Sequence, residues 1–200
     1  RYDLYVPGSV LGGAKDRDKV LIEARQDSRG DWSQAEVKYI FGNGDRARVC
    51  ADAIIERCGI PTEFPADVMD QAQVISSMTV TQEDLDSRLD LRDEPIFTID
   101  SADAKDLDDA ISAHKTVDGY TLGVHIADVS HYVREGSPID REAFLRGTSV
   151  YFADRVIPML PEALSNGVCS LNAGTEKLTF SALMDFDHEG NMTGYRFEKA

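Results

Sequence analysis

Short runs of strand-forming residues, the first of which alternates between apolar and polar positions, fill the first part of the chain. They cover residues 2–6, 19–25 and 34–41, and the last two flank the turn-forming sequence Ser28-Arg29-Gly30-Asp31. Alternation with a period of two residues is typical of half-buried β-strands. Strands this short and closely spaced predict a small β-barrel, or part of one, over residues 1–50.

The next stretch has the pattern of helices rather than strands. Asp45 and Thr81 are the expected N-caps of the first and third helix, and Gly59 is expected just past the end of the first. The three helices are predicted over residues 46–57, 66–77 and 82–90. This acidic, helical stretch predicts a linker between domains over residues 51–89.

From residue 90 onwards, predicted strands and helices are mixed. The dipeptide Asp118-Gly119 predicts a hairpin turn, because it tolerates the positive φ that a tight turn needs. Ser137-Pro138 begins a helix that ends at Gly147. Strands are expected over residues 96–99, 110–114, 120–126, 150–152, 178–186 and 192–197. The expected fold class is α+β, with a small β-barrel followed by a mixed α/β domain over residues 90–200.

Composition places the chain among ordinary globular proteins. Its 200 residues are 42% hydrophobic and 28% charged, and hydrophobic clusters recur throughout, which disfavours disorder. No run approaches the roughly 18 apolar residues of a membrane helix, so no membrane association is expected. Three cysteines without a C-x-x-C motif leave one unpaired in any disulfide scheme, which favours a reduced, cytoplasmic location.

The distribution of charge is more informative than the net charge of −15. Residues 1–50 carry nine Lys and Arg against eight Asp and Glu, whereas residues 51–100 carry three against twelve. Strong net negative charge argues against nucleic acid as a partner. An acidic protein can nevertheless act on polyanions if its carboxylates hold a divalent metal, so net charge does not decide the partner.

Five aspartates lie within ten residues where a predicted strand ends, at positions 100, 103, 106, 108 and 109. Two such charges about 4 Å apart repel by about 4 kcal/mol at an effective dielectric near 20. If the side chains converge, raised pKa values, a basic partner or a bound cation must offset this repulsion. Carboxylates suit magnesium, which prefers oxygen ligands and readies water for phosphodiester hydrolysis. On composition alone, a solvated acidic loop is an equally good interpretation.

Other candidate residues are weaker. His125-x-x-Asp128-x-x-His131 has the residue types of a metal site, but a strand followed by a turn is expected to scatter the three side chains. Tyr151 is, from its context alone, more typical of a core aromatic than of a base-stacking platform. Trp32 fits a core or a surface position equally well.

Several long strings resemble one known family. They are DLRDEPIFTIDSADAKDLDDA over residues 90–110, GVHIADVSHYV over 123–133, RGTSVYF over 146–152, VIPMLPE over 156–162 and LSNGVCSLN over 164–172. These strings, in this order, resemble the catalytic domain of the RNB-domain exoribonucleases, the ribonuclease II and ribonuclease R family. Their residues are more similar to the ribonuclease R branch. Residues 1–89 resemble more loosely the OB-fold cold-shock domain and linker of that family.

The resemblance implies a function and a site. Members degrade single-stranded RNA processively from its 3′ end with Mg²⁺, for which Mn²⁺ can substitute, and release nucleoside 5′-monophosphates. The family's four metal-site aspartates match Asp100, Asp106, Asp108 and Asp109. Asp108 would be the catalytic residue of the set, organising a second metal or the attacking water. The family's aromatic that stacks near the 3′ end of the RNA matches Tyr151.

The resemblance also implies that the chain is an incomplete piece of such an enzyme. It matches a second cold-shock domain and the first part of the catalytic domain, whereas the family's second half supplies an Arg and a Glu to the site. By itself the chain is therefore expected to bind RNA weakly and to lack processive degradation. Two alternatives remain: a non-catalytic RNA-binding OB module, and an inactive scaffold subunit on the same fold. The oligomeric state is not predicted.

Overall fold

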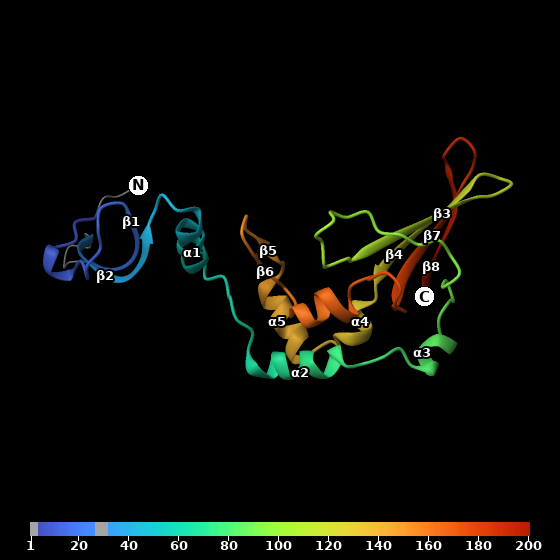
Figure 1. The fold of residues 1–200 in the computed structure, drawn as a ribbon, viewed down its shortest axis with the longest axis horizontal. Coiled ribbons are helices and arrows are strands. Elements are labelled where there is room, and N and C mark those ends of the chain that lie inside the picture. The colour runs from blue at the N-terminus through green and yellow to red at the C-terminus, as the bar shows by residue number, and fades with distance from the viewer. Residues whose placement is uncertain (1–3, 27–31) are drawn as a thin grey trace. The chain divides into compact units, whose positions relative to one another are not determined.

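The computed structural model describes residues 4–26 and 32–200, which divide into two compact units (Figure 1). The first unit contains the residues up to 62 together with 151–157. The second contains residues 63–150 and 158–200. The chain thus leaves the second unit once to return to the first.

The first unit is built on an antiparallel hairpin of β1 (Asp18–Gln26) and β2 (Trp32–Asn43), preceded by the short turn η1 (Gly8–Val10). Half-buried and exposed residues alternate along most of β1, as its sequence predicts. The two predicted strands are therefore confirmed. The strand expected over residues 2–6 does not form at Leu4–Val6, and its first two residues, like the turn at 28–31, lie outside the described residues.

Helix α1 (Ala47–Cys58) packs on this hairpin through Ala51 and Ile55, which lie one turn apart and are buried. Its end at Gly59 is confirmed, since Gly59 adopts the left-handed conformation with φ of 62°. The predicted N-cap was wrong: Arg46 occupies that position without a side-chain cap. Asp45 is instead paired with Arg17, with 3.0 Å between the guanidinium and the carboxylate.

A second short strand pair completes the first unit. β5 (Val150–Tyr151) pairs with β6 (Val156–Ile157), which places a strand at the predicted position. In the loop between them, the Arg155 guanidinium forms an ion pair with Asp52 of α1. This ion pair fixes the returning segment to the helix.

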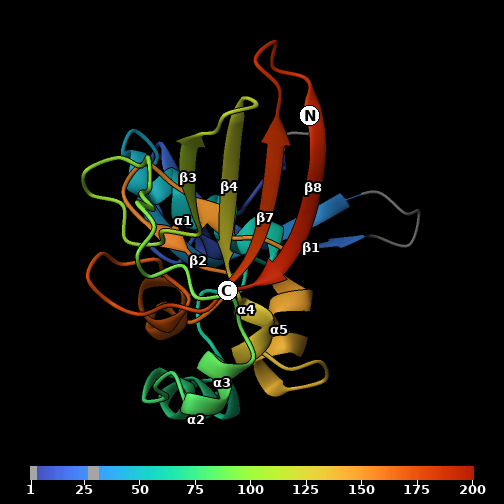
Figure 2. The same cartoon turned by 90° about the vertical axis from the view of Figure 1, so that its right-hand side faces the viewer.

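The second unit is organised around a four-stranded antiparallel sheet in the order β3-β4-β7-β8 (Figure 2). Two hairpins form it: β3 (Asp109–Lys115) with β4 (Tyr120–Ala127), and β7 (Thr179–Phe186) with β8 (Met192–Lys199). Both were predicted, and Gly119 in the first turn has a φ of 148°. An added Cβ there would lie 2.0 Å from the Phe186 carbonyl oxygen, so only glycine fits.

The strand predicted over residues 96–99 was wrong. Phe97 makes only an isolated bridge to Ile111 of β3, with N–O distances of 3.0 and 2.9 Å. Pro95 has no amide hydrogen to extend the ladder in one direction. In the other direction Ile99 is 79% exposed, so the apolar run continues without a partner strand.

Helices pack together at one end of this sheet, where β4 ends and β7 begins (Figure 1). They are α2 (Ala66–Ser76), α3 (Gln82–Asp86), α4 (Val129–Tyr132), α5 (Pro138–Arg146) and the π-helical turn η2 (Leu164–Val168). The main core lies among them and consists of Val68, Ala72, Ile75, Tyr132, Ile139, Leu164, Cys169 and Leu178. The expected cap at Ser137 and stop at Gly147 are confirmed for α5. Thr81 caps α3 as predicted, but that helix is shorter than expected.

Within the described parts of the chain, no helix is both long enough and apolar enough to cross a bilayer.

Candidate active site

The acidic segment, residues 100–109, connects the Phe97 bridge to the start of β3. Asp109 is the first residue of β3 and pairs with Ile126 of β4. The carbonyl of Asp108 accepts a hydrogen bond of 3.0 Å from the amide of Ala127. The last two aspartates are thus fixed to the sheet through their backbones.

A loop that follows η2 holds the middle of the same segment. The amide of Leu107 donates to the Ser170 hydroxyl at 3.0 Å, and the carbonyl of Leu107 accepts from the amide of Leu171 at 2.8 Å. The amide and carbonyl of Leu107 and the carbonyl of Asp108 are therefore all hydrogen-bonded, by two different parts of the second unit. The acidic segment has no regular secondary structure before Asp109, but it has a defined path.

Three of the predicted aspartates act electrostatically on the fourth, Asp108. Burial raises the pKa of Asp108, and the negative charges of Asp106, Asp109 and Asp100 raise it further. A nearby like charge disfavours the ionised form of a carboxyl. The charges of the other three aspartates thus oppose ionisation of Asp108, and a bound cation would relieve that effect.

The donor chemistry of this region fits magnesium. Within the described residues, no group of three or more His, Cys, Asp and Glu side chains is arranged to hold a metal ion. Magnesium, however, usually binds one or two carboxylates and completes its shell with water and substrate phosphate. Four aspartates, of which Asp100, Asp108 and Asp109 are exposed, suit that mode better than a closed protein cage.

The three residues of the His125-x-x-Asp128-x-x-His131 pattern are scattered, as expected. His125 is 1% exposed, and its ring nitrogens contact the hydroxyls of Ser112 at 3.0 Å and Ser181 at 2.9 Å. Burial lowers the pKa of His125, which favours the neutral ring. Its role is that of a hydrogen-bonded core residue.

The other two residues of that pattern have partners elsewhere. Asp128 forms a buried ion pair with Arg88 at 2.6 Å. His131 lies 3.7 Å from the carboxylate of Asp84, near α3. The three residues of the pattern therefore lie where β4 ends and α4 begins, and they do not form a metal site.

Tyr151 lies in the first unit, at the end of β5, and is 66% exposed. This exposure disagrees with a core aromatic, the more typical assignment from sequence context. Trp32, at the start of β2, is 55% exposed and is likewise a surface residue. Both rings are accessible on the surface of the first unit.

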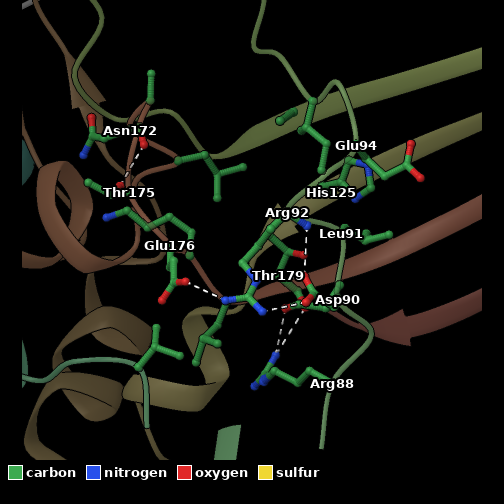
Figure 3. Close-up of a pocket in the computed structure, with 18 of the residues that line it drawn as sticks. Arg88, Asp90, Leu91, Arg92, Glu94, His125, Asn172, Thr175, Glu176 and Thr179 are labelled. Carbon is green, nitrogen blue, oxygen red and sulfur yellow. Dashed lines mark hydrogen bonds and ion pairs between the residues drawn. The ribbon is translucent and has the colours of Figure 1, made fainter. Parts of the chain in front are cut away.

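A cavity of about 730 Å³ lies on the second unit, and sequence analysis did not predict it (Figure 3). Most of its walls come from residues 88–98, from Ala110 and His125 of the sheet, and from residues 171–179, and Leu107 of the acidic segment also lines it. Arg92 bonds to Asp90 at 2.6 Å and to Glu176 at 2.8 Å across it. No local pattern indicates a cavity whose walls lie some 80 residues apart in the sequence.

The cavity meets the acidic segment at Leu107, but not at its aspartates. Ala110 lines the cavity, and successive side chains of a strand point to opposite faces. Asp109 therefore points to the other face of β3. None of the four predicted aspartates lines the cavity, so its size alone does not make it the candidate active site.

The RNB domain model matches residues 88–200 and the cold shock domain model matches residues 1–65. The chain belongs to the RNB-domain family. Its fold class, a cold-shock or OB-type unit followed by a mixed α/β region with antiparallel sheets, agrees with the expectation.

Within that family, the chain is similar to ribonuclease R. It is 48% identical over 198 residues to ribonuclease R of Thermotoga maritima, which covers 97% of this chain and 28% of that protein. Mycoplasma genitalium ribonuclease R in complex with double-stranded RNA matches with a TM-score of 0.82 and 30% identity, over 98% of this chain and 35% of that one. The same protein in complex with ribose-methylated single-stranded RNA matches with a TM-score of 0.81.

The same fold occurs in a protein that is described as a pseudonuclease. Yeast Ssd1 matches with a TM-score of 0.71 but only 18% identity, over 98% of this chain and 26% of that one. The chain thus spans about a third or less of the length of each of these proteins.

Proposed function

We propose that this chain carries the metal-binding aspartates of a 3′-to-5′ exoribonuclease. The protein would hydrolyse single-stranded RNA processively from its 3′ end and release nucleoside 5′-monophosphates, with Mg²⁺ or Mn²⁺ as cofactor. The observation that carries the proposal is the acidic segment, in which the charges of Asp106, Asp109 and Asp100 add to burial in raising the pKa of Asp108, and whose last residues are hydrogen-bonded to the sheet. The reduced cysteines of the sequence favour a cytoplasmic location.

The four aspartates would have two roles, metal binding and orientation of the attacking water. Asp100, Asp106 and Asp109 would hold the metal, and Asp108 would orient the attacking water or a second ion. When bound, magnesium supplies a readied water and stabilises the oxygen that leaves the phosphodiester. The repulsion between these carboxylates supports this assignment, because a cation is the simplest group that offsets it.

Tyr151 is proposed as a stacking platform for the RNA. A ring that is 66% exposed offers a face to a base. Stacking on an aromatic side chain is worth about 1–3 kcal/mol per base and depends little on sequence. A processive nuclease needs that tolerance, since every nucleotide must pass the same position.

The fold by itself does not decide between an enzyme and an inactive scaffold, because the pseudonuclease Ssd1 shares it. The four intact aspartates favour an enzyme. They also disfavour a purely RNA-binding module, whose affinity would gain nothing from negative charge beside a polyanion.

The decisive experiment separates catalysis from binding. In the complete enzyme that contains this chain, Asp108→Asn is expected to abolish shortening of a 5′-labelled oligoribonucleotide with Mg²⁺, while its affinity for single-stranded RNA changes little. Asp103→Asn is the matched control, since it makes the same chemical change in the same segment outside the proposed set, and it should leave the ladder of products unchanged. Equal loss of affinity and activity in Asp108→Asn would instead assign Asp108 to substrate binding.

A further inference from the structure

One buried hydroxyl contacts the acidic segment on both sides of a single aspartate. The hydroxyl of Ser170 lies 2.8 Å from the carbonyl of Lys105 and 3.0 Å from the amide of Leu107. Ser170 is 0% exposed, so water cannot replace either bond. The residue between these two backbone groups is Asp106.

The geometry assigns the direction of each bond. A serine hydroxyl has one hydrogen to donate and two lone pairs that accept. The hydrogen goes to the Lys105 carbonyl at 2.8 Å rather than to the Asn172 amide oxygen at 3.5 Å, and the Leu107 amide donates to the serine oxygen. One side chain thus satisfies the polar groups that flank Asp106.

Ser170 is itself held firmly. It follows the π-helical turn η2, where the amide of Ser170 bonds to the carbonyl of Gly167 at 3.1 Å and that of Cys169 bonds to Leu164 at 3.0 Å. Leu164 and Cys169 belong to the main core and are 0% and 2% exposed. The position of the Ser170 hydroxyl is therefore set by the core of the second unit, not by the acidic segment.

We propose that Ser170 is a positioning residue of the acidic site. By fixing the backbone on both sides of Asp106, its hydroxyl sets the distance of this carboxylate from Asp108 and Asp109, and so sets the affinity for a divalent cation. The inference rests on the proposed function, since it requires that these aspartates bind metal. Partners that orient metal ligands typically contribute 10–100-fold to affinity or activity.

The test compares two serines. Ser170→Ala removes the hydroxyl beside Asp106. Ser181→Ala is the matched control, because Ser181 is also 0% exposed and its hydroxyl also makes two contacts, to His125 and Thr179, both at 2.9 Å. Each variant of the 200-residue chain is titrated with Mn²⁺, and the free ion is measured by electron paramagnetic resonance. A thermal melt without metal measures the general loss of stability.

We expect Ser170→Ala to raise the Kd for Mn²⁺ at least tenfold and Ser181→Ala to change it less than twofold, although both lower Tm. Equal Mn²⁺ affinity in Ser170→Ala and the parent, or an equal loss in the two variants, would overturn the proposal. If Ser170→Ala does not fold, Ser170→Cys replaces it, because a thiol fills the space but bonds weakly. Wild-type affinity in Ser170→Cys would also overturn the proposal.

Asp106→Asn in the same titration distinguishes this inference from the proposed function. If Asp106→Asn loses Mn²⁺ binding and Ser170→Ala does not, only the role of Ser170 is wrong. If the parent chain does not bind Mn²⁺, or if Asp106→Asn binds like the parent, the metal site itself is wrong and both proposals are overturned.

Discussion

The two units of this chain are stabilised by different means. In the described part of the first unit, the buried apolar side chains are few: Ala35, Ala51, Ile55 and Ile157. In the second unit, eight buried residues from helices, turns and the position before β7 form one core. Catalytic groups must be held within fractions of an ångström by locked neighbours. The unit with the larger core is also the one that fixes the acidic segment.

The units differ in charge as well. Residues 1–50 are nearly neutral, whereas residues 51–200 carry 12 Lys and Arg against 28 Asp and Glu. Exposed rings such as Trp32 and Tyr151 lie in the first unit, and the four aspartates lie in the second. Exposed rings also lie in the second unit, for example Phe144 and Tyr195, so the two units differ in charge rather than in exposed aromatic side chains.

Among the substitutions that test this comparison of the units, the largest loss of stability is expected from breaking the buried ion pair of the second unit. The side chains of Arg88 and Asp128 are 6% and 2% exposed and lie 2.6 Å apart. Arg88→Ala leaves a buried carboxylate without its partner, which typically costs about 3–5 kcal/mol. Urea unfolding at neutral pH, followed by circular dichroism, measures the loss. A change below about 1 kcal/mol would show that the pair does not stabilise the unit.

The pH dependence of this pair has a definite sign. Burial raises the pKa of Asp128, but hydrogen bonds from Arg88 and Ser130 lower it by more, so its pKa lies below the usual 3.8. A group with a lowered folded pKa contributes stability that is present above the unfolded pKa and is lost as the pH falls through the folded one. The difference in the free energy of unfolding between the parent and Arg88→Ala should therefore be largest near neutral pH. It should become smaller below about pH 4.

A core substitution is expected to have the next largest effect. Leu164→Ala, at a position that is 0% exposed, should cost about 3 kcal/mol through lost burial and the cavity it leaves. Leu21→Ala makes the same change in β1 of the first unit, where the leucine is 38% exposed, and should cost clearly less. Circular dichroism follows the whole chain, and emission from Trp32, the one tryptophan of the sequence, follows the first unit. Similar losses of stability in Leu164→Ala and Leu21→Ala would show that the two units do not differ in how much their cores stabilise them.

Features that depend on neighbouring residues could be predicted from the sequence. The turn at Asp118-Gly119 and the helix from Ser137-Pro138 to Gly147 both formed, because a positive φ or a cap is a local requirement. Predictions failed where a distant partner decided the outcome. Asp45 pairs with Arg17 instead of capping α1, and the run at Phe97 met one residue of β3 rather than a strand.

In the candidate site, too, local features could be predicted from the sequence and contacts with distant residues could not. The spacing of Asp100, Asp106, Asp108 and Asp109 is visible in the sequence, whereas the raised pKa of Asp108 depends on where the fold places the other three. The contact of Ser170 with the segment that contains Asp106 crosses more than 60 residues, and a serine between Cys169 and Leu171 carries no sequence signal for it. That contact depends on how η2 packs into the core.

The smallest predicted effect compares the first turns of one helix from each unit. In α3, the Thr81 hydroxyl accepts from the amide of Asp84 at 3.2 Å, and the Asp84 carboxylate accepts from the amide of Thr81 at 3.0 Å. In α1, Arg46 occupies the N-cap without a side-chain bond. Loss of such a cap typically costs about 1 kcal/mol. Thr81→Ala should therefore destabilise α3, whereas Arg46→Ala should hardly affect α1.

Hydrogen exchange at equivalent amides measures this difference directly. The amide of Leu85 bonds to the carbonyl of Thr81, and the amide of Cys50 bonds to the carbonyl of Arg46, both at 3.1 Å. In Thr81→Ala, exchange at Leu85 should accelerate about fivefold, which corresponds to about 1 kcal/mol of local opening. In Arg46→Ala, exchange at Cys50 should stay within twofold of the parent. Equal acceleration at the two amides would show that the cap of α3 gives the second unit no local advantage over the first.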